Sequence, residues 1–190
     1  MRVLTKDEFL LEKAKFISEI RKGAVFIHPT DTIYGIGCSV LGSEAVNKVR
    51  EIKQRRFMPF SILVPSKEWI SENCDVDDKA QEWIDKLPGA YTLILSLKNK
   101  DSIVPEVNNS LRTVGVRIPD HWFSSFVQEL GIPIITTSAN VVGENFMTSL
   151  KDLDDRIKSS VDFIVYEDEK KGSPSTIIDL SKKETQITKR

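Results

Sequence analysis

The sequence predicts an α/β domain in which helices pack on a twisted, mixed β-sheet. Short apolar runs typical of buried strands alternate along the chain with segments whose apolar residues recur at helical spacing. No internal repeat, low-complexity tract or long linker divides the 190 residues, so we expect a single domain over residues 1–190.

Charge and cysteine usage narrow the functional classes. The 27 basic and 28 acidic side chains leave a net charge of −1, so any basic binding site must be local. Cys38 and Cys74 are too few and too far apart for a disulfide framework or a CxxC metal site. No apolar run reaches the roughly 18 residues of a membrane span. The charged N-terminus is typical of a helix start rather than a secretion signal. We therefore expect a cytoplasmic protein without a membrane partner.

The first predicted helix starts at a capping box. Thr5 and Glu8 have the spacing at which each side chain can bond the other's free backbone N–H. Apolar residues then recur at helical spacing as far as Gly23, where we expect the helix to end.

The stretch from residue 24 to residue 40 is the first candidate ligand site. Its apolar run ends at Pro29, and hydroxyl residues and glycines follow, which indicates a buried strand that opens into an irregular loop. In an extended loop Thr30 and Thr32 point to one side and Asp31 to the other. Hydroxyls beside bare backbone suit a polar small molecule; an ordinary strand-to-turn connection is the alternative.

The remaining elements follow from capping residues, helical spacing and short apolar runs. Helices are expected from Ser43 to about Lys53, over 77–87 with Ala80, Trp83, Ile84 and Leu87 buried, from Asp120 to Gly131, and from Ser149 to Ile157. Strands are expected over 60–64, 91–97, 111–118, 132–137, 163–166 and 176–180, followed by a polar end.

Familiar phosphate-binding loops are missing from the sequence. Gly35 and Gly37 form a GxG that lacks the third glycine of a dinucleotide fingerprint, and no glycine-rich run ends in the Lys-Ser/Thr of a P-loop. The best phosphate candidates are instead five cations within nine residues, from Lys48 to Arg56, which only Glu51 opposes.

Two of these cations, Lys53 and Arg55, face one ligand only if the helix ends between them. On a continuous helix they would lie about 200° apart, and Pro59 favours an early ending because residues before proline avoid the helical region. Arg55 would then grip phosphate oxygens in a bidentate fork, with Lys53 as a point charge. A solvated basic helix end and a nucleic-acid patch are the alternatives.

Two later strands carry polar residues at positions suited to ligands. Ser138 and Asn140 lie two apart at the C-terminal end of a buried strand, where open α/β sheets place ligands. A polar turn is the alternative. Strand alternation puts Thr113, Gly115 and Arg117 on one face. Arg117 would there capture a carboxylate, or else form an exposed ion pair.

Residues for nucleophilic or metal chemistry are not arranged in recognisable motifs. His28 and His121 make no HExxH or other metal-ligand spacing, and no serine or cysteine lies in a nucleophile elbow. We therefore expect neither a catalytic triad nor a protein-bound metal centre. The inventory is typical of a template that positions charged substrates.

Six segments, in the same order, resemble the YrdC/TsaC family of threonylcarbamoyl-adenylate synthases over nearly the whole chain. Each motif alone is weak evidence for the family. The six together are strong evidence, because chance would have to reproduce both the residue identities and their spacing. They are PTDTIYG at 29–35, KQR at 53–55, LPGAYTLIL at 87–95, VRIPDH at 116–121, SAN at 138–140 and GSPST at 172–176.

The resemblance implies a YrdC-like fold with an open, positively charged cavity. It also implies a nucleotidyltransferase that makes threonylcarbamoyl-AMP from L-threonine, bicarbonate and ATP, with Mg²⁺ assisting and pyrophosphate released. The product would serve the N6-threonylcarbamoyladenosine (t6A) modification of tRNA through downstream transfer proteins. Transfer RNA or double-stranded RNA is a further candidate partner.

Site residues are carried over from the family by position. The resemblance assigns ATP to Lys53, Arg55, Thr113, Ser138, Asn140 and Arg190, with Lys53 and Arg55 also catalytic. It assigns L-threonine to Thr32, Arg117, Thr136 and Ser175, with Arg117 on the carboxylate. A noncatalytic RNA-binding module is one alternative. A paralogue with another acyl or carbamoyl substrate is the second, because Arg56 stands where the family usually has proline.

Overall fold

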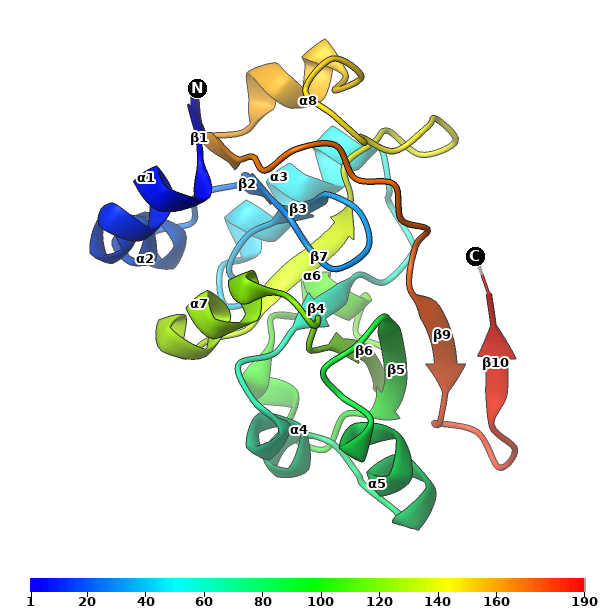
Figure 1. The fold of residues 1–190 in the computed structure, drawn as a ribbon. Coiled ribbons are helices and arrows are strands. Elements are labelled where there is room, and N and C mark those ends of the chain that lie inside the picture. The colour runs from blue at the N-terminus through cyan, green and yellow to red at the C-terminus, as the bar shows by residue number, and fades with distance from the viewer. Residues whose placement is uncertain (190) are drawn as a thin grey trace.

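The computed structural model describes residues 1–189, in which ten strands form one twisted mixed sheet surrounded by helices (Figure 1). The strand order is β1-β8-β2-β3-β7-β4-β6-β5-β9-β10. The strands are β1 Arg2–Leu4, β2 Phe26–His28, β3 Gly35–Gly37, β4 Ser61–Leu63, β5 Tyr91–Ser96, β6 Thr113–Arg117, β7 Ile134–Ser138, β8 Phe163–Val165, β9 Thr176–Asp179 and β10 Gln186–Thr188. The predicted α/β class with a mixed sheet is confirmed.

The helices fill the connections between strands. They are α1 Lys6–Leu11, α2 Lys13–Arg21, α3 Ser43–Lys53, α4 Lys67–Asn73, α5 Asp78–Asp85, α6 Pro105–Asn108, α7 Trp122–Leu130 and α8 Asp155–Ser160, with a 3₁₀ turn at Lys100–Ser102. Within residues 1–189 every helix falls short of the length and apolar character that crossing a membrane requires.

The sheet separates two hydrophobic cores. Neighbouring residues along a strand point to opposite faces, so Phe26 of β2 packs in a phenylalanine-rich core with α1, α2 and α7, while Ile27 packs in the larger core. Leu63 and Ile62 of β4 divide in the same way. Helices therefore cover both faces of the sheet.

The predicted start of α1 and the predicted end of α3 are confirmed. The capping box between Thr5 and Glu8 is present, although the expected single helix breaks at Glu12 into α1 and α2. Helix α3 ends at Lys53, as predicted, because Gln54 takes a left-handed conformation with φ 51°.

Other predictions of local structure were wrong. Ser43 does not cap α3: Gly42 is the cap residue, and the Ser43 hydroxyl donates to Glu106 Oε2 at 3.1 Å. Ser149 bonds Asp152 within a turn, and α8 begins only after Asp154, whose side chain accepts from Arg156 N.

The remaining differences concern elements with short or atypical patterns. The expected irregular loop after Pro29 contains β3, because Gly35–Gly37 pairs with both β2 and β7. Helices α4 and α6 and strands β1 and β10 were not predicted. Helix α7 starts one residue later than expected, with His121 rather than Asp120 as its N-cap residue. Trp83 of α5 is half-buried rather than buried.

The loop after α3 is held by one arginine. The guanidinium of Arg50 donates to the carbonyl oxygens of Arg55 at 2.9 Å and Met58 at 3.2 Å, and also to that of Glu106. Loop residues that would otherwise leave their carbonyls to solvent are thus fixed to α3 and α6.

Residues 166–175, here called the strap, connect β8 to β9 without regular structure. Figure 1 shows the strap in orange, running from the β1-β8-β2 side of the sheet to the β5-β9 side. Because β8 and β9 belong to opposite halves of the sheet, the strap crosses the region between those halves.

Candidate active site

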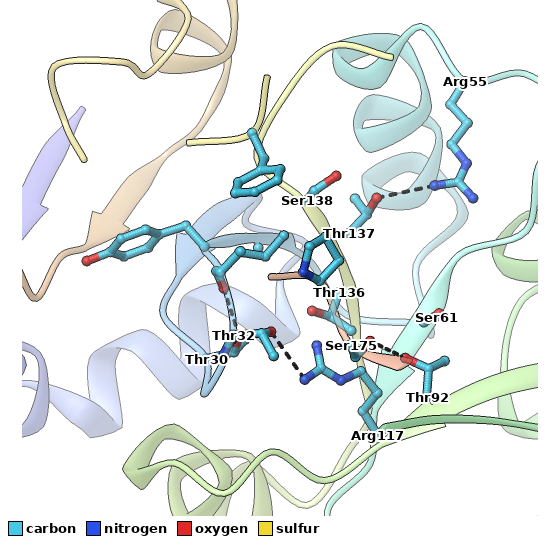
Figure 2. A pocket seen from close by; sticks show the side chains of 15 residues that line it. Thr30, Thr32, Arg55, Ser61, Thr92, Arg117, Thr136, Thr137, Ser138 and Ser175 are labelled. Carbon is cyan, nitrogen blue, oxygen red and sulfur yellow. Dashed lines mark hydrogen bonds between the residues drawn. The ribbon is translucent and has the colours of Figure 1, made fainter. Parts of the chain in front are cut away.

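A pocket lined mainly by hydroxyl groups opens over the middle of the sheet (Figure 2). Its floor is set by strand register: Ser61 of β4 pairs with Thr136 of β7 on one side and with Gly115 of β6 on the other. A Cβ atom at Gly115 would lie 2.9 Å from Ser61 Oγ, so glycine keeps this row open. The lining residues are Thr30, Thr32, Ile33, Tyr34, Gly35, Arg55, Ser61, Thr92, Arg117, Thr136, Thr137, Ser138, Phe146, Pro174 and Ser175.

Hydrogen bonds fix the direction of the two threonines in the loop after β2. Thr30 Oγ1 donates to Ile33 O at 2.7 Å and accepts from Thr32 N at 3.1 Å. Because Thr30 already donates its single hydroxyl proton to Ile33 O, Thr32 Oγ1 must be the donor in the 2.9 Å contact between the two threonine hydroxyls. The lone pairs of Thr32 Oγ1 remain for Arg117, whose Nη2 lies 3.4 Å away.

Arg117 forms a buried ion pair at this end of the pocket. Its Nη2 lies 2.8 Å from Asp31 Oδ1, and the two side chains are only 7% and 10% exposed. The alternative of an exposed ion pair is therefore wrong. Asp31 Oδ2 also accepts from Asp120 N at 3.1 Å, which ties the loop after β2 to the end of β6.

Arg55 lies at the opposite end of the pocket. Its guanidinium donates to Pro59 O at 2.7 Å and to Thr137 Oγ1 at 3.4 Å, and lies over the Phe60 ring at 5.2 Å. Figure 2 shows Arg55 and Arg117 at the two ends, with residues of β7 between them. This arrangement suits a ligand, or a pair of ligands, with two separated anionic groups.

Lys53 lies beneath the turn that follows β7. It is 2% exposed, and its Nζ donates to Ser138 O at 2.6 Å, Asn140 Oδ1 at 2.7 Å and Ser138 Oγ at 3.3 Å. Burial, with a smaller contribution from the Arg55 charge, lowers the pKa of Lys53 to about 7. In this structure its ammonium holds the 138–140 turn and is not part of the pocket lining.

The structure brings most of the predicted site residues together. Those that line the one pocket are Thr32, Arg55, Arg117, Thr136, Ser138 and Ser175. Lys53 and Asn140 adjoin it through Ser138. Thr113 lies on β6 opposite Ser96 of β5, outside the lining, and Arg190 lies outside the described residues.

Sequence analysis missed Ser61, Thr92 and Thr137 as pocket residues. Thr92 Oγ1 and Ser175 Oγ lie 2.7 Å apart, so β5 and the end of the strap share a hydroxyl pair at the pocket wall. These residues carry no local motif. They reach the pocket through strand register, although Thr92 lies within one of the six family-like segments.

Fold and pocket together define an α/β protein with a hydroxyl-lined cavity between two arginines, a lining suited to small polar molecules. The chain belongs to the Sua5/YciO/YrdC family, whose profile, described as "Telomere recombination", matches residues 18–190.

Three relatives illustrate the similarity. Over 166 residues the chain is 40% identical to a Methanocaldococcus jannaschii protein provisionally named threonylcarbamoyl-AMP synthase, covering 85% of this chain and 77% of that one. It matches the crystal structure of P. abyssi Sua5 complexed with L-threonine at TM-score 0.85 and 27% identity, covering 98% of this chain and 56% of that one. The E. coli YciO crystal structure matches at TM-score 0.84 and 25% identity, covering 100% and 94%.

Proposed function

We propose that this chain is an enzyme, an L-threonylcarbamoyladenylate synthase of the nucleotidyltransferase class. The observation that carries the proposal is the single pocket in which hydroxyls and two arginines from distant parts of the chain meet. The name of the M. jannaschii relative and the threonine in P. abyssi Sua5 support it. Because the chain spans 56% of that Sua5 chain, the substrates of the whole relative enter here as part of the proposal.

The Arg117 end is the proposed L-threonine site. The guanidinium of Arg117 would pair with the amino acid carboxylate, and the hydroxyls of Thr32, Thr136 and Ser175 would bond its polar groups. The buried Asp31 partner holds Arg117 at 2.8 Å, so the guanidinium is oriented before the ligand arrives.

The Arg55 end is the proposed ATP site. Arg55 would bind phosphate oxygens through its planar fork, with Ser138 beside it. Lys53 would act by holding the 138–140 turn from below, and would add positive charge when protonated.

Magnesium is proposed to enter with ATP as part of the substrate. Within residues 1–189 no group of three His, Cys, Asp or Glu side chains is arranged to hold a metal. Mg²⁺ characteristically keeps several waters and binds substrate phosphates with few protein ligands. A Mg²⁺–ATP complex therefore fits this pocket better than a resident metal.

The proposed reaction has two steps. The threonine amine and bicarbonate form a carbamate with loss of water. A carbamate oxygen then attacks the α-phosphorus of ATP, and the bond to pyrophosphate breaks. The protein would contribute by orienting the reactants and by neutralising charge with Arg55 and Arg117, for which effective molarities of roughly 10⁵ M are available in favourable cases.

Incubation with ATP, Mg²⁺, labelled bicarbonate and L-threonine tests the proposal. We expect pyrophosphate release that depends on threonine, with label in an AMP-linked product. L-Valine is the matched control, because it has the same shape but lacks the hydroxyl, and a site that bonds a hydroxyl discriminates against it. Release without any amino acid dependence would contradict the proposal.

A second candidate function is a paralogous enzyme with another acyl or carbamoyl acceptor. Arg56 favours it, because this arginine stands in the loop after α3 where the family usually has proline. Turnover with a different acceptor in the same assay would support this candidate. Binding of tRNA without turnover would instead support a noncatalytic RNA-binding role.

A further inference from the structure

The strap forms one wall of the pocket through Pro174 and Ser175. At its far end Ser175 Oγ contacts Thr92 Oγ1 at 2.7 Å. At its near end Glu167 N donates to the Tyr34 hydroxyl at 2.9 Å, and that hydroxyl contacts Asp168 O at 2.8 Å. The strap is thus attached at both ends to strands and loops that line the pocket.

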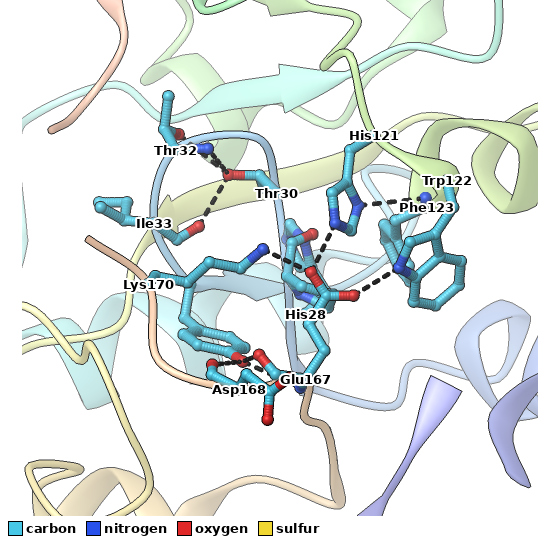
Figure 3. A network of polar contacts seen from close by, with 12 residues as sticks. His28, Thr30, Thr32, Ile33, His121, Trp122, Phe123, Glu167, Asp168 and Lys170 are labelled. Carbon is cyan, nitrogen blue, oxygen red and sulfur yellow. Dashed lines mark hydrogen bonds and ion pairs between the residues drawn. The ribbon is translucent and has the colours of Figure 1, made fainter. Parts of the chain in front are cut away.

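The Glu167 carboxylate adds a separate attachment at the near end (Figure 3). His121 Nε2 lies 2.6 Å from Oε1, and Trp122 Nε1 donates to Oε2 at 2.5 Å. Lys170, on the strap itself, donates to Oε1 as well. Three donors therefore converge on one carboxylate whose side chain is 24% exposed.

The hydrogen bonds also determine which ring nitrogen of His121 carries the proton. Phe123 N donates to His121 Nδ1 at 3.2 Å, which caps α7, so Nδ1 carries no proton. Nε2 therefore carries the proton and donates it to Glu167. Burial lowers the pKa of His121, which agrees with a neutral ring. The Glu167 carboxylate is thus bound by two neutral N–H donors, His121 Nε2 and Trp122 Nε1, at the start of α7.

This junction connects the strap to the wall that carries Arg117. Helix α7 follows β6 after a short turn, and Asp31 bonds both Arg117 and Asp120 N in that turn. The Glu167 carboxylate, bound to the first residues of α7, therefore fixes the position of the strap relative to Arg117. From this arrangement we propose that Glu167 is a positioning residue, which holds the strap so that Ser175 completes the pocket.

The proposal concerns the strap directly, and it rests on the proposed function only for its ligand. The variant Glu167→Gln retains size but loses the charge that binds Lys170, His121 and Trp122. We expect faster amide hydrogen exchange over residues 166–175 than in the wild type, and roughly tenfold weaker L-threonine binding. ATP affinity and the melting temperature should stay close to wild type, which separates positioning from a general structural role.

Two further variants sharpen the test. Glu169→Gln makes the same change at an exposed neighbour on the strap and should leave exchange and affinity unchanged. His121→Asn keeps an acceptor suited to the helix cap but is too short to reach Glu167. The effect of the double variant should be smaller than the sum of the two single effects, because both substitutions weaken the same contact between His121 and Glu167.

Unchanged strap exchange in Glu167→Gln overturns the proposal, whatever the ligand. Unchanged threonine affinity in that variant overturns it too, provided that the wild type binds threonine. A wild type that binds no threonine contradicts the proposed function instead, and the exchange measurement then decides for or against the strap attachment alone.

Discussion

Arg55 is the residue on which the proposed nucleotide site depends most. Its guanidinium donates to Pro59 O and Thr137 Oγ1 and lies over the Phe60 ring, and Arg55 is not among the core residues. We expect Arg55→Ala to weaken ATP binding at least roughly tenfold, since a bidentate charged contact is lost, while the chain stays folded.

Titration calorimetry with ATP, with circular dichroism as the fold check, measures this effect. Arg56→Ala removes an exposed neighbouring arginine and is the matched control. Equal ATP affinity of Arg55→Ala and the wild type would refute the assignment of this arginine.

His28 is one source of the dependence of stability on pH. Its ring is fully buried and stacked on Phe123 at 4.9 Å, and its Nε2 has no hydrogen-bond partner among residues 1–189. Burial lowers the pKa of His28 to about 3 from 6.5. The unfolded chain therefore binds the proton more readily. The contribution of His28 to stability is complete above about pH 6.5 and declines as the pH falls towards about 3.

The variant His28→Phe keeps the stacked ring and removes the titration. We expect the unfolding free energy of the wild type to fall more steeply below about pH 6.5, by up to about 1.4 kcal/mol per pH unit relative to the variant. Urea titrations of both proteins at several pH values measure the difference. Parallel pH profiles would show that His28 does not titrate as described.

Lys53 shows what prediction from single residues leaves out: the alternative of a solvated charge is wrong, because Lys53 is buried. A lysine at the end of a basic helix suggests a solvated charge or a phosphate ligand, yet its Nζ bonds Ser138 and Asn140, which lie more than eighty residues later. Arg117 and Thr32 could be predicted from local alternation and family motifs. The buried Asp31 partner of Arg117 could not, because it depends on the path of the loop after β2.

At the scale of elements, Gly172 allows the strap to approach the loop after β2. A Cβ atom at Gly172 would lie 2.3 Å from the backbone oxygen of Thr32, closer than any such contact in proteins, so the strap would have to move. We expect Gly172→Ala to weaken threonine binding by about tenfold or more, with a smaller effect on global stability. Ser173→Ala, at an exposed neighbouring position, is the control.

Calorimetry with L-threonine and thermal melts of the two variants separate these effects. If Gly172→Ala bound threonine like the wild type, the strap could move without altering the pocket, and the close approach would have no functional role.

The elements that sequence analysis predicted well are those with strong local signals. Apolar runs marked β5, β7 and β9, and the proline at residue 59 indicated that α3 ends at Lys53. Strand β3 is Gly-Ile-Gly, and two of its three residues are glycines, which are depleted in strands. It forms because β2 and β7 pair with both of its edges, which is tertiary information.

At the scale of the molecule, the pocket exists because of pairing between distant strands. The row formed by Thr136, Ser61 and Gly115 joins three strands, and single-sequence patterns do not encode which strands become neighbours. The family resemblance supplied part of this long-range information. It identified Thr136 and Ser175, but gave no role to Ser61 or Thr92.

The composition of the pocket also predicts how the protein responds to metal removal. Since no cluster of metal-binding side chains is present within residues 1–189, chelation with EDTA should leave the melting temperature unchanged. Turnover in the synthase assay should stop on chelation and return when Mg²⁺ is added in proportion to ATP. A melting temperature that fell on chelation would instead indicate a resident structural metal.

The position of β8 has a consequence for synthesis of the chain. In the sheet order β8 lies between β1 and β2, so Val3 pairs with Ile164 and Ile27 pairs with the same residue from the other side. As the nascent polypeptide leaves the ribosome, β1 must wait until β8 has been made before it gains a neighbour. Such delayed closure exposes β1 and one edge of β2 to other newly made chains, which makes timely chaperone protection during translation valuable to this fold.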